Sequence, residues 1–347
     1  MSHSPPLPTE EDLVVLRTRA AALARIREFF SARGSLEVET PALVASPGVD
    51  AHLDAIEATL RPGGVHGTAV RQWLRTSPEY HMKRLLAAGS GSIFQLGKAW
   101  RDGEVGDLHE PEFTMLEWYS TGLNDWELMN ETEELVRDLA AEFGGGRLRT
   151  SSMEAVAEHG GPPFDRITFR SAFLQHTGLD PETADPRSLG RMLRASGTKP
   201  PGQATREDLV DLLLGCVVQP QLGQGVPVFV TDWPTDRAGL AQIRPGRDPD
   251  KLPAAARFEL YACGIELCNG YHELTDAAEQ QARIDHENRR RLDAQKEPYP
   301  MDEHFLDALR AGLPQCAGNA LGVDRLLLLL LGLERLSQVR CFTLESL

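Results

Sequence analysis

The 347-residue sequence predicts an α+β fold. An amphipathic helical pattern opens the chain, strand-like segments recur in both of its halves, and a segment rich in proline and glycine separates the halves. With 41% hydrophobic and 25% charged residues, the chain can bury a sizeable core as one large globular domain or two smaller ones.

The elements follow one another in a clear order. Residues 1–11 read as a disordered leader, and the next apolar residues have helical spacing up to about Gly34. The residues expected on the buried face of this helix are Leu16, Ala20, Leu23, Ile26 and Phe30. The segments expected to be strands in the first half are Trp73–Thr76, Ile93–Leu96 and Phe113–Tyr119, and those expected to be helices are Pro78–Ala88 and Asp125–Phe143.

The sequence pattern changes between about residues 144 and 251, where proline and glycine interrupt short helical patterns. This segment reads as a helical insertion between two halves of one sheet. The strands expected after it are Phe258–Tyr261, Ile265–Cys268 and Gln315–Val323, and a leucine-rich helix follows them.

Composition excludes several classes of protein. The five cysteines show no paired CxxC spacing, so we expect free thiols and neither a disulfide framework nor a zinc site. The longest apolar run, Leu326–Leu331, is too short to cross a bilayer, and the N-terminus does not resemble a signal peptide, so we expect a soluble cytoplasmic protein. A net charge of -15 argues against a broad phosphate-binding surface.

Arg101 is the first candidate functional residue. It leaves the apolar segment Phe94–Trp100 and precedes a polar loop, which leads to a second apolar segment, Phe113–Tyr119. At the end of a strand, its guanidinium can bind a phosphate or carboxylate through two parallel hydrogen bonds. Taken alone, an arginine in such a position is more often a solvated surface charge.

Glu259 and Glu266 lie in a predicted β-hairpin. If the chain turns at Ala262-Cys263, the two glutamates oppose each other across the strands, and their like charges repel. A divalent cation removes that repulsion, and Mg²⁺ prefers carboxylates together with substrate phosphates. In another register the same residues are two exposed glutamates.

A third motif, Gly318–Leu326, reads as a strand of small residues that runs into a helix. Glycine allows a flat ligand to approach the backbone closely. Arg325, at the start of the helix, can face an anionic group there. We expect Asp324 to be a simple helix cap.

Together these segments resemble motifs 1, 2 and 3 of the class II aminoacyl-tRNA synthetases, in the right order. Motif 1 corresponds to Gly34–Leu43, motif 2 to Phe94–Tyr119 and motif 3 to Gly318–Leu326. The resemblance covers nearly the whole chain. It implies a catalytic core with an antiparallel sheet flanked by helices over residues 12–347, and a homodimer paired through motif 1.

Within this class the chain is similar to the lysyl branch through Thr76–Leu86 and Gly264–Leu274. It resembles most the elongation factor P lysine ligases, truncated paralogs of lysyl-tRNA synthetase. About thirty residues precede motif 1, so we expect no OB anticodon-binding domain. Ala320 replaces the glycine of the synthetases, as in the ligases, and its methyl group is expected to reshape the amino-acid pocket.

The resemblance also implies a role for each residue that matches a family motif. The residues implied for binding the lysine-like substrate are Ser77, Pro78, Glu79, Glu117, Tyr119, Glu266, Asn269, Tyr271, Glu273 and Ala320. Those implied for ATP are Arg101, Asp102, Gly103, Glu110, Glu259, Leu260, Gly322 and Arg325. Arg101 and Arg325 are implied to clamp the phosphates, and Glu259 and Glu266 to hold Mg²⁺; these four are the expected catalytic residues.

Charge supports this assignment, because three acidic groups in one pocket are costly unless cations fill it. Motif 2 departs from the family pattern, since the sequence reads Arg101-Asp102-Gly103-Glu104 and Glu110 replaces an asparagine. The loop that contains Asp102, Gly103 and Glu110 therefore differs from the ATP-binding loop of the family.

The sequence leaves three functions to compare. The first is an ATP-dependent ligase that activates (R)-β-lysine or lysine and transfers it to a lysine of elongation factor P, with no tRNA partner. The second is a free-standing lysyl-tRNA synthetase-like enzyme that charges tRNA or a small acceptor. The third, a silent regulatory paralog, fits poorly with the retention of Arg101, Glu259, Glu266 and Arg325.

Overall fold

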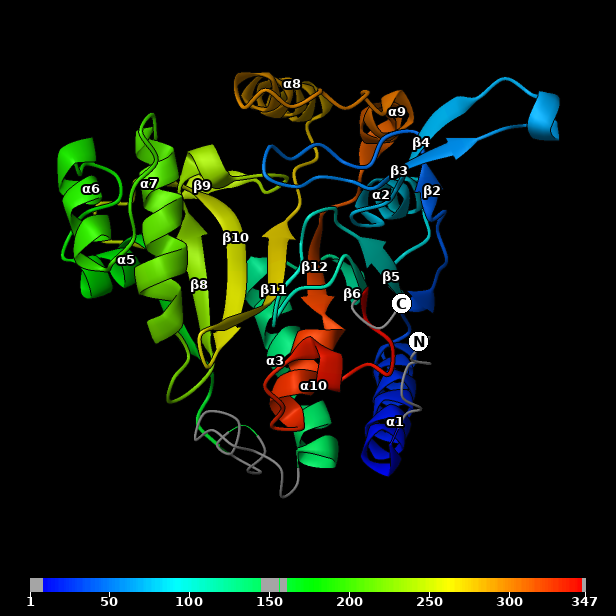
Figure 1. The fold of residues 1–347 in the computed structure, drawn as a ribbon, viewed down its shortest axis with the longest axis horizontal. Helices are drawn as coiled ribbons and strands as arrows, with labels where there is room; N and C mark the ends of the chain where they lie inside the picture. The colour runs from blue at the N-terminus through cyan, green and yellow to red at the C-terminus, as the bar shows by residue number, and fades with distance from the viewer. Residues whose placement is uncertain (1–8, 145–155, 157–160, 345–347) are drawn as a thin grey trace, which may run out of the picture. The chain divides into compact units, whose positions relative to one another are not determined.

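The computed structural model describes residues 9–144, 156 and 161–344. Within them the chain forms two compact units, and each is described by itself. The first comprises the described residues among 1–124, 273–328 and 333–347, and the second comprises the described residues among 125–272 and 329–332. Strands and helices mix in both units, as expected for an α+β protein (Figure 1).

The first unit contains most of the sequence motifs. Its helices are α1 (Glu10–Ala32), α2 (Glu79–Ala87), α8 (Ala277–Asp293), α9 (Glu303–Gly312) and α10 (Val323–Leu330), with short 3₁₀ turns at Gly64–His66 and Leu336–Gln338. Its strands are β1 (Leu36–Glu37), β2 (Leu43–Val44), β3 (Glu57–Leu60), β4 (Val70–Leu74), β5 (Ile93–Trp100), β6 (Glu112–Thr121) and β12 (Cys316–Gly322).

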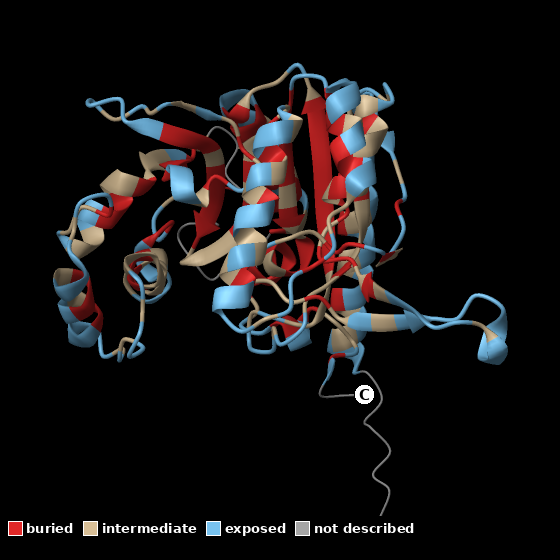
Figure 2. Cartoon of the chain, turned by 90° about the horizontal axis from the view of Figure 1, so that it is seen from above, coloured by how far each residue is buried: buried red, intermediate tan, exposed pale blue. Residues whose placement is uncertain are grey.

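Strands β1, β5, β6 and β12 lie in that order in the main sheet of this unit. β1 pairs parallel with β5, and the β5–β6 and β6–β12 pairs are antiparallel. Helix α1 packs on these strands, where Phe30 stacks on Phe94 with 4.9 Å between the ring centroids. A second sheet, β2-β4-β3, ends in a hairpin whose side chains are mostly exposed (Figure 2).

Helix α1 begins at a capping box between Thr9 and Asp12, so residues 10 and 11, expected in the leader, are helical. Residues 1–8 of the expected leader lie outside the described residues. The expected apolar face is correct at Ile26 and Phe30 but wrong in the first turns. There Val15 is buried, whereas Leu16 is 44% exposed.

The second unit combines helices with the remaining strands. Its helices are α3 (Asp125–Phe143), α5 (Phe169–Thr177), α6 (Pro186–Ala195) and α7 (Arg206–Leu213), a π-helical turn at Leu214–Val218, and 3₁₀ turns at Gln219–Gln221 and Thr235–Arg237. Its strands are β7 (Asp165–Thr168), β8 (Val228–Trp233), β9 (Ile243–Pro245), β10 (Pro253–Ala262) and β11 (Ile265–His272).

Strands β11, β10, β8 and β7 lie in that order, and β9 pairs with β10. The segment expected to be a helical insertion therefore also contributes the strands β7, β8 and β9. Every side chain of β8 is buried, which removes the alternating pattern that marks a half-buried strand. Helices α5, α6 and α7 gather beside β8 (Figure 1), and their core includes Phe169, which lies 4.7 Å from Trp233 between ring centroids.

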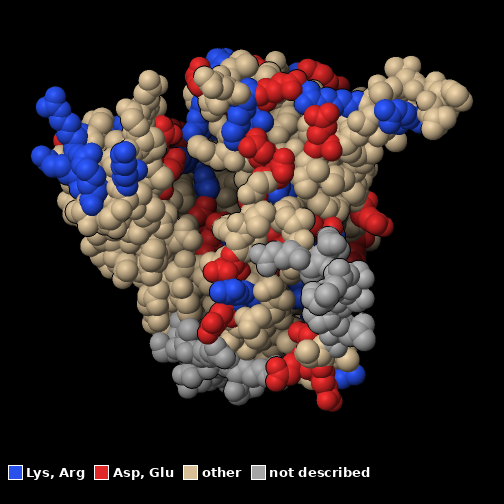
Figure 3. All heavy atoms as spheres, viewed as in Figure 1, with Lys and Arg blue, Asp and Glu red and all other residues tan. Residues whose placement is uncertain are grey.

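The five cysteines all lie in the described part of the chain and are free thiols, as expected. Among the described residues, no helix has both the length and the apolar character needed to span a bilayer. In the space-filling view of Figure 3, lysine and arginine gather over the α6 end of the second unit, where Arg187, Arg191 and Arg194 are exposed. This is a local cluster on one short helix.

Candidate active site

The substrate residues expected on β6 and β12 share one face of the sheet. Glu117 and Tyr119 are two positions apart on β6 and therefore project on the same side, and their direct partners on β12 are Ala320 and Gly318. Directly paired residues of an antiparallel ladder project on the same side. The structure thus places Ala320 beside Glu117.

Two hydroxyl groups orient the buried carboxylate of Glu117. Tyr119 Oη donates to Glu117 Oε1 at 2.7 Å, and Ser77 Oγ donates to Glu117 Oε2 at 2.7 Å. Ser77 Oγ also accepts from the backbone N–H of Glu79 at 3.0 Å. Burial, together with repulsion from Glu79, raises the pKa of Glu117 to about 7. The carboxylate is therefore held in one orientation and is poised to gain a proton when no cation is near.

Pro78 precedes the first residue of α2 and directs Glu79 into its first turn. One turn later, the side chain of Lys83 is completely buried. Its Nζ lies 2.6 Å from Glu79 Oε1 and 2.6 Å from Glu273 Oε2. Sequence reasoning missed Lys83, although the four-residue spacing of Glu79 and Lys83 on a predicted helix is a recognisable signal for an ion pair.

Glu273 follows the last residue of β11 and is 1% exposed. Its backbone N–H donates to Cys316 O at 3.0 Å, which fixes it against β12. A Cβ atom at Gly318 would lie 2.3 Å from Glu273 Oε1, so only glycine leaves room for this carboxylate. Burial raises the pKa of Glu273 to about 8 despite the opposing effect of Lys83. We refer to Glu79, Glu117 and Glu273 as the carboxylate cluster.

In the second unit, the expected metal residues lie on one face of the β10–β11 hairpin. Glu259 pairs directly with Asn269, and Glu266 pairs directly with Tyr261. The expected direct opposition of Glu259 and Glu266 is therefore wrong. The hairpin turns at Cys263-Gly264 instead, and an irregularity between Leu260 and Tyr261 shifts the register again.

The two glutamates nevertheless remain diagonal neighbours on the same face. Glu259 and Tyr261 are two positions apart on β10 and project on the same side, and Tyr261 is the direct partner of Glu266. Burial and repulsion from Glu266 raise the pKa of Glu259 to about 7, although Arg257 acts in the opposite direction. Two mutually repelling carboxylates are a donor set that suits Mg²⁺. Among the described residues no group of three or more potential metal ligands occurs, so phosphate oxygens would have to complete the coordination.

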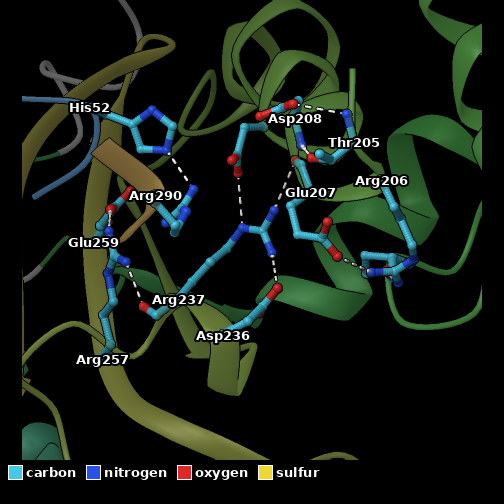
Figure 4. A network of polar contacts seen from close by, with 12 residues as sticks. His52, Thr205, Arg206, Glu207, Asp208, Asp236, Arg237, Arg257, Glu259 and Arg290 are labelled. Carbon is cyan, nitrogen blue, oxygen red and sulfur yellow. Dashed lines mark hydrogen bonds and ion pairs between the residues drawn. The ribbon is translucent and has the colours of Figure 1, made fainter. Parts of the chain in front are cut away.

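Arg257 contacts several of the residues on this face. The sequence had not indicated a role for it. Its guanidinium donates to Glu259 Oε1 at 2.5 Å and to the carbonyl of Arg237 at 2.7 Å (Figure 4). The same group donates to Asn269 Oδ1 at 3.2 Å. It also lies 5.9 Å from the centroid of the Tyr271 ring. A single arginine therefore orients three of the expected site residues.

The network continues to the helical part of the same unit. Arg237 Nε donates to Asp211 Oδ1 at 2.9 Å. Arg237 Nη2 donates to the carbonyl of Glu207 on α7 at 3.0 Å (Figure 4). Leu260, expected to line the nucleotide, is completely buried on β10.

The two expected phosphate-binding arginines both border the loop between β5 and β6. Arg101 begins this loop, pairs with Glu104 at 3.7 Å and lies 5.1 Å from the Phe113 ring centroid. Its buried Nε has no hydrogen-bond partner among the described residues, which leaves a donor for an anion. Arg325, in the first turn of α10, donates to Leu108 O at 3.2 Å and lies 2.7 Å from His109 Nε2.

The remaining motif 2 residues lie in the same loop. The N–H of Asp102 donates to Asp54 O at 2.7 Å, and Gly103 has a positive φ of 75° that favours glycine. Glu110 accepts from the N–H of Leu344 at 3.2 Å. Gly322 ends β12 opposite Met115.

Asp324 is not the helix cap that the sequence suggested. It lies inside the first turn of α10 and is 2% exposed. Arg19 on α1 donates to Asp324 Oδ1 at 2.5 Å, and the N–H of Thr114 on β6 donates to Asp324 Oδ2 at 2.9 Å. Asp324 therefore joins motif 3 to helix α1 and to motif 2.

Comparison with known proteins identifies the family of the chain. The family of class II tRNA synthetases (D, K and N) matches residues 7–346. The chain therefore belongs to the class II tRNA synthetase family. Within that family, it is 42% identical to the elongation factor P--(R)-beta-lysine ligase of Vibrio cholerae, over 99% of this chain and 98% of that relative. The ligase of the same name from Salmonella typhi is 42% identical over 95% of both chains, and that of Salmonella arizonae is 41% identical over 95% of both.

Proposed function

We propose that this protein is an ATP-dependent ligase that activates (R)-β-lysine, or lysine, and transfers it to a lysine side chain of elongation factor P. The observation that carries the proposal is the carboxylate cluster, in which Glu117 is oriented by Ser77 and Tyr119. Relatives that share more than two fifths of the sequence bear the name of this activity.

The carboxylate cluster suits a diamino acid. Ammonium groups donate to carboxylates through short, charge-assisted hydrogen bonds, and the raised pKa values of Glu117 and Glu273 show that burial disfavours their charged forms. The substrate residues proposed are those implied by the resemblance: Ser77, Pro78, Glu79, Glu117, Tyr119, Glu266, Asn269, Tyr271, Glu273 and Ala320.

In the proposed first step, a carboxylate oxygen of the amino acid attacks the α-phosphorus of ATP, the bond to pyrophosphate breaks, and an acyl-adenylate forms. Arg101 and Arg325 neutralise charge on the phosphates and align them. Mg²⁺ held by Glu259 and Glu266 would supply further charge neutralisation when bound. Other proposed ATP residues are Asp102, Gly103, Glu110, Leu260 and Gly322.

In the proposed second step, the neutral ε-amine of the acceptor lysine attacks the acyl carbon, AMP leaves, and the amine loses a proton as the amide forms. We propose that residues 12–347 act together as one catalytic domain, that the enzyme works in the cytoplasm as a homodimer, and that it does not use tRNA.

The test is ATP–pyrophosphate exchange with α-lysine, both enantiomers of β-lysine and ornithine, followed by transfer assays that offer elongation factor P and tRNA-Lys separately. We expect exchange to be fastest with (R)-β-lysine and transfer to go to elongation factor P. Efficient charging of tRNA-Lys with no modification of elongation factor P would instead establish the synthetase-like function.

A further inference from the structure

Lys83 introduces a positive charge into the carboxylate cluster. Its ammonium is completely buried on α2 and contacts one oxygen of Glu79 and one of Glu273, each at 2.6 Å. Burying an unpaired ammonium costs several kcal/mol, so such a lysine persists only where its partners offset that cost. Its Nζ also lies 6.0 Å from the centroid of the Tyr119 ring.

The ionisable groups around the cluster come from several elements of the first unit. They are Arg75 before α2, Glu79, Tyr80 and Lys83 on α2, Glu117 and Tyr119 on β6, Glu273 after β11 and Cys316 on β12. Of these, Lys83 is the cation that touches two of the cluster carboxylates directly.

The charges of the cluster can be counted. Three ionised carboxylates and the Lys83 ammonium leave an excess of two negative charges. A diamino acid such as lysine or β-lysine carries two ammonium groups, so the excess matches the substrate. Without Lys83 the excess would be three, and one carboxylate would remain uncompensated in a buried site.

We propose that Lys83 is a positioning residue for amino-acid recognition, which fixes Glu79 and Glu273 in place and sets the negative charge of the carboxylate cluster to that of a diamino acid. This inference rests on the proposed function, which assigns the cluster to the amino-acid substrate. Lys83 acts through the carboxylates and is not itself expected to contact the reacting atoms.

The electrostatics of the site support this role. Burial opposes charge on Lys83, but pairing with Glu273 and Glu79 outweighs burial and raises its pKa, so the ammonium persists at neutral pH. Lys83 in turn lowers the pKa values of Glu117 and Glu273, which burial raises to about 7 and about 8. Removing Lys83 must therefore raise both pKa values further.

The sign of the pH dependence follows from these shifts. Carboxylates bind ammonium groups in their ionised form, so the KM for the amino acid should fall as pH rises through the titration of Glu117 and Glu273. In Lys83→Met these two carboxylates ionise at higher pH. The pH range over which KM falls should therefore shift upward by roughly one pH unit or more. As a result, KM at pH 7 should rise by about 10-fold.

The variants to compare are Lys83→Met, Lys83→Arg and, as a matched control, Lys296→Met. Lys296 also lies 2.6 Å from a carboxylate, that of Asp54, but its side chain is 33% exposed. Exchange kinetics with β-lysine are measured from pH 6 to pH 9, and proton release on β-lysine binding is measured by calorimetry in buffers of different ionisation enthalpy.

We expect Lys83→Met to show the shifted pH profile, Lys83→Arg to weaken binding while keeping the wild-type midpoint because it keeps the charge, and Lys296→Met to behave as wild type. If Lys83→Met lowers thermal stability but leaves KM and its midpoint unchanged, Lys83 is only structural and the inference is wrong. If Lys83→Met does not fold, a shifted midpoint in Lys83→Arg would equally overturn it. Failure of wild type to activate any diamino acid would instead refute the proposed function.

Discussion

Glu266 tests the assignment of the metal site at the scale of a single residue. Glu266→Gln removes one negative charge from the β10–β11 face and changes little volume, so the chain should fold normally. Loss of a metal-binding carboxylate should lower magnesium-dependent exchange by about 100-fold. Exchange kinetics over a range of Mg²⁺ concentrations measure this effect.

The control for this change is Glu279→Gln on α8, which also removes one charge but at a side chain that is 47% exposed and pairs with Arg283. If both variants retain wild-type exchange, Glu266 does not belong to the site.

Ala320 tests substrate choice. It lies directly across from Glu117, and its methyl group is expected to meet the α-amino group of an α-amino acid. Ala320→Gly should therefore improve activity with α-lysine relative to β-lysine, by ~1–3 kcal/mol in discrimination if this methyl decides the preference. The measurement is kcat/KM for exchange with each amino acid.

Ala317→Gly controls for the flexibility that a glycine adds to a strand. Ala317 lies three positions before Ala320 and therefore projects from the other face of β12. An equal change of the lysine to β-lysine ratio in both variants would show that backbone flexibility, and not the methyl group, sets the preference.

At the scale of elements, the contact of Arg19 with Asp324 ties α1 to α10, and Thr114 adds β6. Arg19→Met leaves the buried carboxylate of Asp324 without its cation. Removing one partner of a buried ion pair costs about 3–5 kcal/mol in free energy of unfolding. Denaturant unfolding of the purified protein measures the loss.

Arg27→Met is the matched change on the same helix. Arg27 pairs with Glu37, and both side chains are more than two fifths exposed, so its loss should cost about 0.2–1 kcal/mol. Equal losses of stability in the two variants would contradict a joining role for Asp324.

At the scale of the whole molecule, we predict a homodimer paired through motif 1. Leu13 and Leu16 on α1 are 39% and 44% exposed, and Leu36 on β1 is 56% exposed. A second copy of the chain would cover these apolar side chains. Analytical ultracentrifugation at micromolar concentration should therefore show a dimer, which Leu16→Asp should weaken.

Leu60→Asp is the control for the dimer, because Leu60 on β3 is also 44% exposed but lies outside both α1 and the motif 1 strand β1. A wild-type monomer at micromolar concentration, or equal effects of the two substitutions, would refute the expected interface.

The sequence by itself was sufficient for the α+β fold and for the places of the long strands β5, β6, β10, β11 and β12. These depend on local periodicity, which each segment carries independently of its neighbours. The order of the three motifs followed from the resemblance to the family. Helix Asp125–Phe143 agrees to the residue with α3. Periodicity was less informative at β8, where burial on both faces hides the alternation, and in the first turns of α1, where two apolar stripes compete.

Only the tertiary structure decided which charged groups meet. One shifted residue in the hairpin made Glu259 and Glu266 diagonal neighbours instead of direct partners. Lys83 receives one of its two carboxylates, that of Glu273, from a distant part of the chain. The tertiary fold determines ionic partners of this kind, because it brings residues that are distant in the sequence close together. Local pattern therefore defines the elements, while long-range packing determines the charge of the site that they form.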